Sequence, residues 1–291
     1  MTEPIIKLRN AFQQALSSIS PIYSEPEATS LIELVFRHIL NCSRFELHRR
    51  FDTNLLISQQ IQLNEIIIEL QKHKPLQYIL GETEFYGLTF KVGAGTLIPR
   101  PETEELVEWI LSENRNFPSL KVIDIGTGSG CIPVVLAKNL NSPIIEAIDV
   151  SEDALRFAKE NSRLNNCNIN FRKQDILTTT FSEAPQYDII ISNPPYIPEH
   201  DRIFMASNVL DFEPGLALFV PDKEPLVFYR KILEFALLAG KPGAKVYFEI
   251  HENYGNEIRQ MFSVKGFENI TIRKDLNGKV RMASGHLPLA P

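Results

Sequence analysis

The sequence predicts an α/β protein with a seven-stranded, mostly parallel sheet, a C-terminal antiparallel hairpin and a small N-terminal all-helical domain. After Leu120, short β-branched segments alternate with helical patterns, which is typical of parallel strands covered by helices on both faces. Before Lys74 the chain contains no glycine, and its apolar residues recur at three- and four-residue spacing. This spacing indicates packed amphipathic helices, with expected starts near Ser24, Asp52 and Ser58.

Seven segments have the composition of strands. They are residues 121–125, 144–149, 169–171, 187–192, 245–250, 270–273 and 280–283. The last two flank the turn sequence Asp275-Leu276-Asn277-Gly278, which predicts an antiparallel hairpin. Two further short strands around Gly87 predict a hairpin that links two domains. We therefore expect a helical domain at 1–75, the linking β-hairpin at 76–95 and the α/β domain at 96–291.

The bulk composition narrows the class of function. The net charge of −6 and the pI of about 5.6 give the whole chain no positive field for clamping many phosphates. Cys42, Cys131 and Cys167 lie far apart without a C-x-x-C, so we expect reduced, buried thiols rather than disulfides or a zinc site. No apolar run reaches the roughly 18 residues of a membrane span. We expect a cytoplasmic protein that binds neither membrane nor metal.

The most informative motif is Asn193-Pro194-Pro195-Tyr196, which directly follows a predicted buried strand. Parallel sheets bind ligands beyond the carboxyl ends of their strands. The Asn193 side-chain oxygen and the Pro194 carbonyl can each accept one hydrogen of a planar NH₂ group, and Tyr196 offers a ring face for stacking. Pro195 holds Pro194 in an extended conformation. The motif indicates a site that grips a planar nitrogen and aims its lone pair at an electrophile.

A glycine-rich turn, Gly126–Gly130, follows the first strand of the predicted sheet. The dinucleotide fingerprint requires G-x-G-x-x-G/A, but here the glycines alternate and Cys131 occupies the last position of the fingerprint. The turn therefore gives less reason to expect a pyrophosphate. It favours a cofactor with a ribose and an amino-acid tail but no phosphates.

Two aspartates follow successive strands. Asp149 ends one strand, and its carboxylate can hold both hydroxyls of a ribose. Ser151 offers a cap for the helix that begins near Glu152, which leaves Asp149 available for a ligand. Asp175 follows the next strand, where it can accept a hydrogen bond from an adenine amino group while Ile176 packs on the ring.

Together these motifs resemble the Rossmann-like class I S-adenosylmethionine-dependent methyltransferases that modify planar nitrogens, a superfamily that includes adenine-N6 and protein glutamine methyltransferases. The segments Leu97–Glu104, Gln77–Gly81 and Glu213–Leu218 are similar to the peptide release factor glutamine methyltransferases, the PrmC or HemK family. The resemblance covers nearly the whole chain, although the helical domain matches by architecture more than by residues. His251 stands where the family commonly has glycine, and we expect only a surface or capping role for it.

The resemblance implies roles for the motif residues. Those implied in cofactor binding are Gly126, Thr127, Gly128, Ser129, Gly130, Asp149, Asp175, Ile176 and Asn193. The glutamine pocket would consist of Asn193, Pro194, Pro195 and Tyr196, of which Asn193, Pro194 and Tyr196 would be catalytic. The Arg100–Glu104 segment would close over the cofactor, although a proline followed by acidic residues is also an ordinary helix start.

The implied function is methyl transfer from S-adenosyl-L-methionine to the side-chain amide nitrogen, N5, of the glutamine in the Gly-Gly-Gln motif of peptide chain release factors. S-adenosyl-L-homocysteine is the other product. The helical domain would recognise the substrate, and the enzyme would act as a monomer without stable nucleic-acid binding. Adenine-N6 methylation of DNA or RNA is an alternative that the acidic charge disfavours. Two further alternatives are methylation of a ribosomal-protein glutamine and a non-catalytic binding module on the same fold.

Overall fold

The computed structural model describes residues 6–178 and 186–289. The chain forms two compact units, Met1–Gly81 with Ser207–Phe212, and Glu82–Ala206 with Glu213–Pro291. The domain boundaries predicted near residues 75 and 95 stay a prediction. Within the described ranges, no helix combines the length and the apolar character that crossing a membrane requires.

The first unit is helical. Its elements are α1 (Leu8–Ile19), α2 (Glu25–Leu40), α3 (Arg44–Arg49), α4 (Ile57–Leu70), α5 (Leu76–Leu80) and α9 (Ser207–Leu210). The apolar faces of α1, α2 and α4 meet in one core, to which α2 contributes Ile32, Val35 and Phe36 at helical spacing. As predicted, α2 begins after Ser24, and it ends at Asn41 in the left-handed conformation (φ 44°).

The other two predicted helix starts differ from the structure. Asp52 lies in a turn and begins no helix. Ser58 lies inside the first turn of α4, one residue after the helix begins. The side chain of Gln59, the third residue of the helix, accepts the backbone N–H of Leu56 at 2.9 Å. Gln59 therefore provides a side-chain cap at this helix start, where Ser58 was expected to provide it.

The second unit is built on a seven-stranded sheet in the order β10-β11-β9-β6-β3-β4-β5. Its strands are β3 (Lys121–Ile125), β4 (Ile144–Asp149), β5 (Asn170–Lys173), β6 (Tyr187–Ser192), β9 (Gly240–Glu249), β10 (Glu268–Lys274) and β11 (Val280–His286). Strands β3, β4, β5, β6 and β9 are parallel, while β11 runs antiparallel to β9 and β10. The predicted fold class is confirmed, including the closing antiparallel hairpin.

Helices and short strands surround this sheet. The hairpin of β1 (Glu82–Phe85) and β2 (Leu88–Lys91) precedes it. The helices are α6 (Pro101–Asn114), α7 (Cys131–Asn139), α8 (Glu152–Leu164), α10 (Gly215–Leu218), α11 (Val227–Ala239) and α12 (Gly255–Val264). A parallel pair, β7 (Ile197–Pro198) and β8 (Phe219–Val220), lies near the 3₁₀ helix η1 (Glu199–Phe204), and η2 (Glu252–Tyr254) precedes α12.

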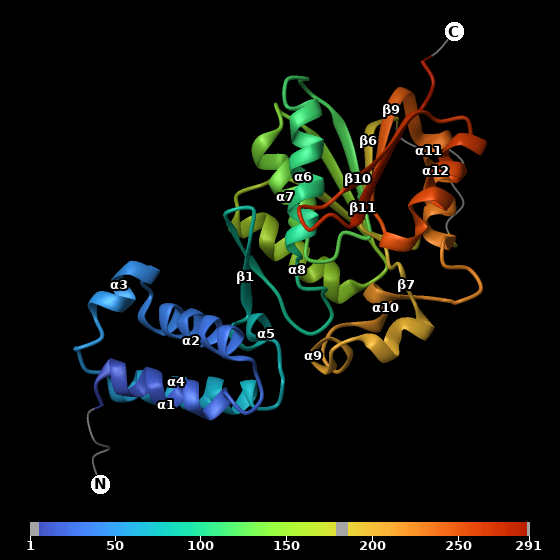
Figure 1. Ribbon diagram of the computed structural model, residues 1–291. Helices are drawn as coiled ribbons and strands as arrows, with labels where there is room; N and C mark the ends of the chain where they lie inside the picture. The colour runs from blue at the N-terminus through green and yellow to red at the C-terminus, as the bar shows by residue number, and fades with distance from the viewer. Residues whose placement is uncertain (1–5, 179–185, 290–291) are drawn as a thin grey trace. The chain divides into compact units, whose positions relative to one another are not determined.

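The central strands are buried on both faces because helices cover both. Val122 and Ile189 belong to a core shared with α6 and α7. Their neighbours Ile123 and Ile190 belong to a second core shared with α11 and α12. Figure 1 shows the two pairs of helices on opposite sides of the sheet. This two-sided burial explains why these strands are nearly continuous apolar runs.

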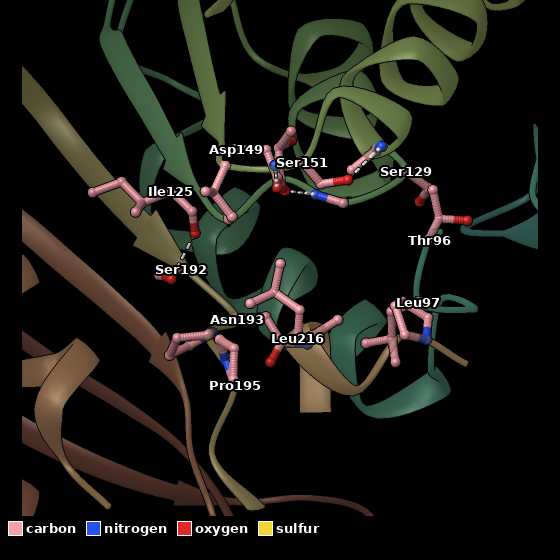
Figure 2. Close-up of a pocket in the computed structure, with 18 of the residues that line it drawn as sticks. Thr96, Leu97, Ile125, Ser129, Asp149, Ser151, Ser192, Asn193, Pro195 and Leu216 are labelled. Atoms are coloured by element: carbon pink, nitrogen blue, oxygen red, sulfur yellow. Dashed lines mark hydrogen bonds between the residues drawn. The ribbon is translucent and has the colours of Figure 1, made fainter. Parts of the chain in front are cut away.

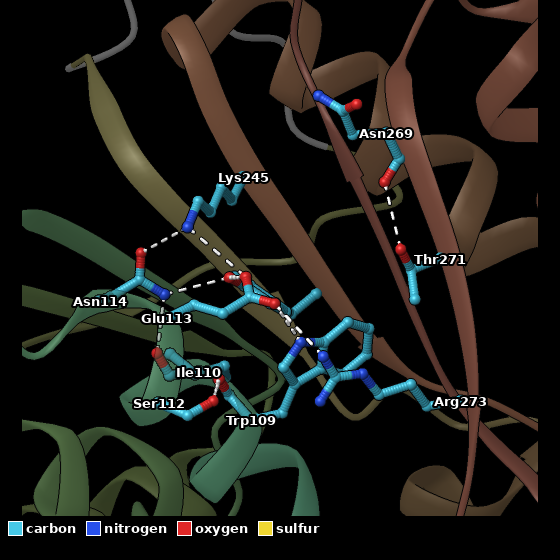
Figure 3. A network of polar contacts seen from close by, with 10 residues as sticks. Trp109, Ile110, Ser112, Glu113, Asn114, Lys245, Asn269, Thr271 and Arg273 are labelled. Carbon is cyan, nitrogen blue, oxygen red and sulfur yellow. Dashed lines mark hydrogen bonds and ion pairs between the residues drawn. The ribbon is translucent and has the colours of Figure 1, made fainter.

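A polar network fixes the second half of α6 to the sheet (Figure 3). The Tyr247 hydroxyl donates to Glu113 Oε2 at 2.7 Å, and Asn114 Nδ2 donates to the Tyr247 hydroxyl at 3.0 Å. The Arg273 guanidinium lies 4.0 Å from the centre of the Trp109 ring. Because Tyr247 on β9 is fully buried, these contacts set the position of α6 along the sheet.

Replacing Tyr247 by Phe should lower the free energy of unfolding by about 1–3 kcal/mol, because Glu113 and Asn114 lose a buried hydrogen-bond partner. Urea denaturation followed by circular dichroism measures the difference. Ser112→Ala is the matched control, since its hydroxyl bonds the Trp109 carbonyl within the same helix, and its effect should stay below about 0.5 kcal/mol. Equal losses in the two variants would contradict a special role for the network.

Candidate functional site

A cavity of about 260 Å³ lies at the carboxyl ends of β3, β4 and β6. The chain passes from β3 to β4 and β5 on one side and then returns to β6 on the other side of β3. The loops that leave β3 and β6 therefore diverge, and open parallel sheets bind ligands in the crevice between such loops. Figure 2 shows Asp149 and Ser129 on one side of the cavity, and Asn193 and Pro195 on the opposite side.

The turn after β3 presents bare backbone to the cavity. Gly126 (φ 74°) and Gly128 (φ 56°) have left-handed conformations, and a Cβ at either position would meet no atom of the described structure within 4 Å. The backbone N–H groups of Gly126 and Thr127 donate to the Ile148 carbonyl at 2.9 and 3.0 Å, which ties the turn to β4. A ligand can therefore lie directly against this backbone.

Gly130 in the same turn has a different structural role. Its φ is 78°, and a Cβ there would lie 3.0 Å from both the Cα and the Cβ of Ala158 on α8. A larger residue would be strained at this φ and would push the turn away from α8. Four of the five predicted turn residues line the cavity, namely Gly126, Thr127, Gly128 and Ser129, whereas Gly130 packs behind it.

Asp149 lines the cavity at the end of β4. Its Oδ2 accepts the backbone N–H of Gly128 at 2.8 Å, and its Oδ1 accepts that of Ser151 at 2.9 Å. Burial raises the pKa of the Asp149 carboxyl, and these backbone donors oppose the rise. Ser151 caps α8, as predicted, by accepting the N–H of Ala154 at 3.2 Å. The carboxylate is thus held in one orientation, with lone pairs left for a ligand.

Asp175 and Ile176 line the same cavity after β5. Asp175 Oδ1 accepts the N–H of Leu177 at 2.8 Å, and Oδ2 accepts the Thr178 hydroxyl at 3.2 Å. These bonds close a turn that holds the buried Ile176 side chain in the cavity wall. An apolar wall beside a carboxylate suits a flat ring that carries an amino group.

The loop after β6 forms the opposite wall. The Ser192 hydroxyl donates to the Ile125 carbonyl at 2.6 Å, which joins the ends of β6 and β3. Asn193, Pro194 and Pro195 then line the cavity. Their backbone emerges one strand away from the glycine turn, so the two predicted motifs face each other across the same space.

Tyr196 lies beside this wall. Its hydroxyl donates to Glu249 Oε1 at 3.2 Å, and its ring meets His251 edge-on, with 6.1 Å between the ring centres. Burial raises the pKa of the Tyr196 phenol, and the nearby Glu249 carboxyl adds to the rise. His251 precedes η2 and accepts the backbone N–H of Asn253 at 3.2 Å, so the predicted capping role is confirmed.

An ion pair joins the segment before α6 to the segment before α10, and both segments border the cavity. Arg100 Nη2 lies 2.5 Å from Glu213 Oε1, and the Ile98 backbone N–H donates to Glu213 Oε2 at 3.1 Å. Arg100 lines the cavity and so does Leu216, which follows Glu213. Pro101 begins α6, as the residue pattern predicts.

Two buried polar residues near the site, Asp124 and Glu249, were not predicted from the sequence. Asp124 and Glu249 stand inside apolar strands, and a carboxyl group in such a strand was the signal that could have revealed them. Burial raises the pKa of Asp124 to about 7; the Thr127 hydroxyl opposes this rise and the Asp149 carboxyl adds to it. Within the described chain, neither carboxylate oxygen of Asp124 has a hydrogen bond of good geometry. Thr103 belongs to the Arg100–Glu104 segment that was expected to close over the cofactor, and it lines the cavity from the first turn of α6.

The cysteines only partly match their prediction. All three are free, but only Cys131 is buried, whereas Cys42 and Cys167 are partly exposed because each lies at the edge of its core. Cys131 lines the cavity, and burial raises the pKa of its thiol to about 12. In the ranges 6–178 and 186–289, no three His, Cys, Asp or Glu side chains are grouped so that they could hold a metal ion.

Residues 8–81 match the sequence model of the PrmC N-terminal domain, and residues 103–211 match that of the methyltransferase small domain. A release factor glutamine methyltransferase from Flavobacterium psychrophilum is 44% identical over 277 residues, which cover 94% of this chain and 96% of that protein. The enzyme of the same name from Bacteroides thetaiotaomicron is 41% identical over 269 residues, which cover 92% and 96%.

Solved structures share the fold at much lower identity. The hMettl16 catalytic domain in complex with a MAT2A 3′UTR hairpin has a TM-score of 0.55 at 16% identity, covering 81% of this chain and 83% of that one. A methyltransferase from Pyrococcus furiosus has a TM-score of 0.50 at 18% identity, covering 80% and 100%. These two likenesses show the fold alone. The matches to the two bacterial relatives over almost their full length show more: the chain belongs to the release factor glutamine methyltransferase family.

Proposed function

We propose that the protein transfers a methyl group from S-adenosylmethionine to the side-chain amide nitrogen, N5, of the glutamine in the Gly-Gly-Gln motif of a peptide chain release factor. The observation that carries the proposal is the cavity between the glycine turn and the Asn193 loop. Membership in the family supports the choice of substrate. The protein would act on its partner in the cytoplasm as a monomer, without stable nucleic-acid binding.

The glycine-turn side of the cavity would hold the cofactor. Gly126 and Gly128 leave open space for its amino-acid tail, and Asp149 would accept hydrogen bonds from the ribose hydroxyls. Asp175 and Ile176 would border the adenine. When bound, S-adenosylmethionine supplies a methyl group on a positively charged sulfur, and the remaining thioether is S-adenosylhomocysteine.

The Asn193 loop would hold the substrate glutamine. Asn193 Oδ1 and the Pro194 carbonyl would each accept one amide N–H, while Pro195 and Tyr196 would complete the pocket. An amide nitrogen is a poor nucleophile because its lone pair is delocalised into the carbonyl. Catalysis would therefore come from orientation and from acceptors that stabilise the positive charge growing on nitrogen. The proton can leave after transfer, and the high pKa of Cys131 argues against a covalent route through that thiol.

Incubation with isotopically labelled S-adenosylmethionine and separate pools of release factor, ribosomal protein and DNA tests the proposal. Mass spectrometry should place the label on the Gly-Gly-Gln glutamine of the release factor. Label on adenine or on a ribosomal-protein glutamine would replace the proposed function by one of those activities. Labelling of none of the pools, together with no cofactor binding in calorimetry, would indicate a non-catalytic module.

Asn193→Ala should reduce turnover of release factor at least about 100-fold, because the acceptor that orients the amide is lost. The dissociation constant for S-adenosylhomocysteine should change by less than about 10-fold, since the glycine turn and both aspartates remain. Asn256→Ala, an exposed asparagine on α12, is the control and should leave both quantities unchanged. Unchanged turnover in Asn193→Ala would remove Asn193 from the catalytic assignment.

Substitution of Gly128, which faces the cavity, and of Gly130, which packs on α8, should damage different properties of the protein. Gly128→Ala should weaken cofactor binding at least about 10-fold with a loss of about 1 kcal/mol in stability, because its Cβ has room in the protein but not beside a ligand. Gly130→Ala should lose more stability, about 1–3 kcal/mol, because its Cβ meets Ala158. Calorimetry measures the change in cofactor binding, and thermal unfolding measures the change in stability. Tight cofactor binding by Gly128→Ala would argue against a cofactor site at the glycine turn.

Cofactor binding should release protons between pH 6 and pH 7. The carboxyl of Asp124 keeps its proton below about pH 7, and a positively charged ligand nearby favours the ionised form. Affinity should therefore rise as the pH increases through this range and then level off. Calorimetry in buffers of different ionisation enthalpy measures the release. Asp124→Asn should release fewer protons over this range, while the exposed Asp222→Asn should behave as wild type.

A further inference from the structure

A chain of hydrogen bonds runs behind Asn193. Asn193 Nδ2 donates to Thr103 Oγ1 at 3.3 Å, and the Thr103 hydroxyl donates to Glu249 Oε2 at 2.6 Å. The other oxygen of Glu249 accepts the Tyr196 hydroxyl at 3.2 Å. The four side chains come from the start of α6, the end of β9 and the loop after β6. Thr103 is 2% exposed and Glu249 is 1% exposed, so water does not compete for these bonds.

The direction of each bond in this chain is fixed by the number of hydrogens. A threonine hydroxyl has one hydrogen to donate, and the Thr103 hydroxyl gives it to Glu249. Thr103 can then only accept from Asn193, so the NH₂ group of Asn193, rather than its oxygen, faces Thr103. The planar amide of Asn193 therefore turns its Oδ1 away from α6. A hydroxyl with a free hydrogen would bond Oδ1 equally well and would allow the opposite orientation.

We propose that Thr103 and Glu249 are positioning residues that hold Asn193 with its Oδ1 available to accept an N–H of the substrate amide. Through the second oxygen of Glu249, the same pair also fixes the hydroxyl of Tyr196. This inference rests on the proposed function, because it assigns the orientation of the group that grips the glutamine. Thr103 also lines the cavity, whereas Glu249 does not, and in this role each acts through Asn193 or Tyr196.

The burial of Glu249 supports a positioning role. Removing a carboxyl group from water is unfavourable, and burial raises the pKa of Glu249. The hydroxyls of Thr103 and Tyr196 and the positive charge of Arg281 oppose the rise. The Tyr229 hydroxyl donates to the Glu249 backbone carbonyl at 3.1 Å, which fixes the end of β9. A carboxylate is the side chain that can accept from both hydroxyls without offering a hydrogen to either.

The two positioning residues are themselves fixed by contacts at some distance. Thr103 lies in the first turn of α6, and the network of Glu113, Asn114 and Tyr247 fixes the last turns of the same helix to β9. Glu249 lies two residues after Tyr247 on that strand. The helix is therefore joined near both of its ends to the last residues of β9, and the distance from Thr103 to Glu249 has little freedom to change.

The test compares Thr103→Val, which has nearly the same shape without the hydroxyl, with Thr103→Ser, which keeps it. Thr103→Val should lower kcat about 10- to 100-fold with little change in the dissociation constant for S-adenosylhomocysteine. Thr103→Ser should recover kcat to within about 3-fold of wild type. The control Thr271→Val removes a hydroxyl that bonds the Asn269 carbonyl on β10, and it should have no effect. Full activity of Thr103→Val, or no recovery in Thr103→Ser, would overturn the proposal.

A double-mutant cycle separates positioning from general damage to the structure. If Thr103 acts through Asn193, adding Thr103→Val to Asn193→Ala should produce no further loss of kcat. A loss that multiplies with that of Asn193→Ala would overturn the proposal. Glu249→Gln should fall between wild type and Thr103→Val, because its amide can accept from only one of the two hydroxyls.

A second measurement keeps this test independent of the substrate. In the S-adenosylhomocysteine complex, the side-chain NH₂ of Asn193 should give NMR signals protected from solvent exchange in wild type and Thr103→Ser. Protection should be lost in Thr103→Val. If wild type fails to methylate release factor but this pattern holds, the proposed function fails while the positioning stands. Equal protection in all three proteins would overturn the positioning whatever the activity.

Discussion

Strand β3 is hydrogen-bonded in parallel to β4 on one side and to β6 on the other, and the registers of these two ladders determine where the site forms. Ile125 at the end of β3 pairs with Ile148 on β4 and with Ser192 on β6. The next residues, Gly126, Asp149 and Asn193, therefore lie at the same level at the carboxyl edge of the sheet. A slip of one residue would move every side chain of a strand from one core to the other, so the packing of the two cores also aligns the three loops.

The two sides of the cavity are built by different means. On the cofactor side, the positions of the turn and of Asp149 depend on backbone hydrogen bonds between neighbouring strands, such as that of Gly126 to Ile148. On the substrate side, the Asn193 side chain depends on Thr103 and Glu249, which lie on other elements. The cofactor side of the cavity is in place once the sheet has formed. The substrate side also requires that α6 is packed against β9.

This difference explains how much could be predicted from the sequence. The positions of the strands, the glycine turn, Asp149, Asp175 and Asn193 were predictable because each of these residues lies at or just beyond the end of a parallel strand, which sets its place. Thr103 is 90 residues from Asn193 and 146 from Glu249 along the chain, so no local pattern connects them. Gly126 and Gly130 look alike in the sequence, and only the approach of α8 separates their roles. The prediction of a helix start at Asp52 was wrong for a related reason: aspartate is favoured in turns as well as at helix N-termini.

The ion pair of Arg100 with Glu213 has a consequence for the movement of ligands. It joins two segments of the cavity wall that are far apart in the sequence, and the Glu213 side chain is almost completely buried. Separating the segments would leave that carboxylate without its cation, at a cost of about 3–5 kcal/mol. This cost opposes separation of the two segments. S-adenosylmethionine and S-adenosylhomocysteine differ in charge and volume. The other walls of the cavity must adjust to this difference.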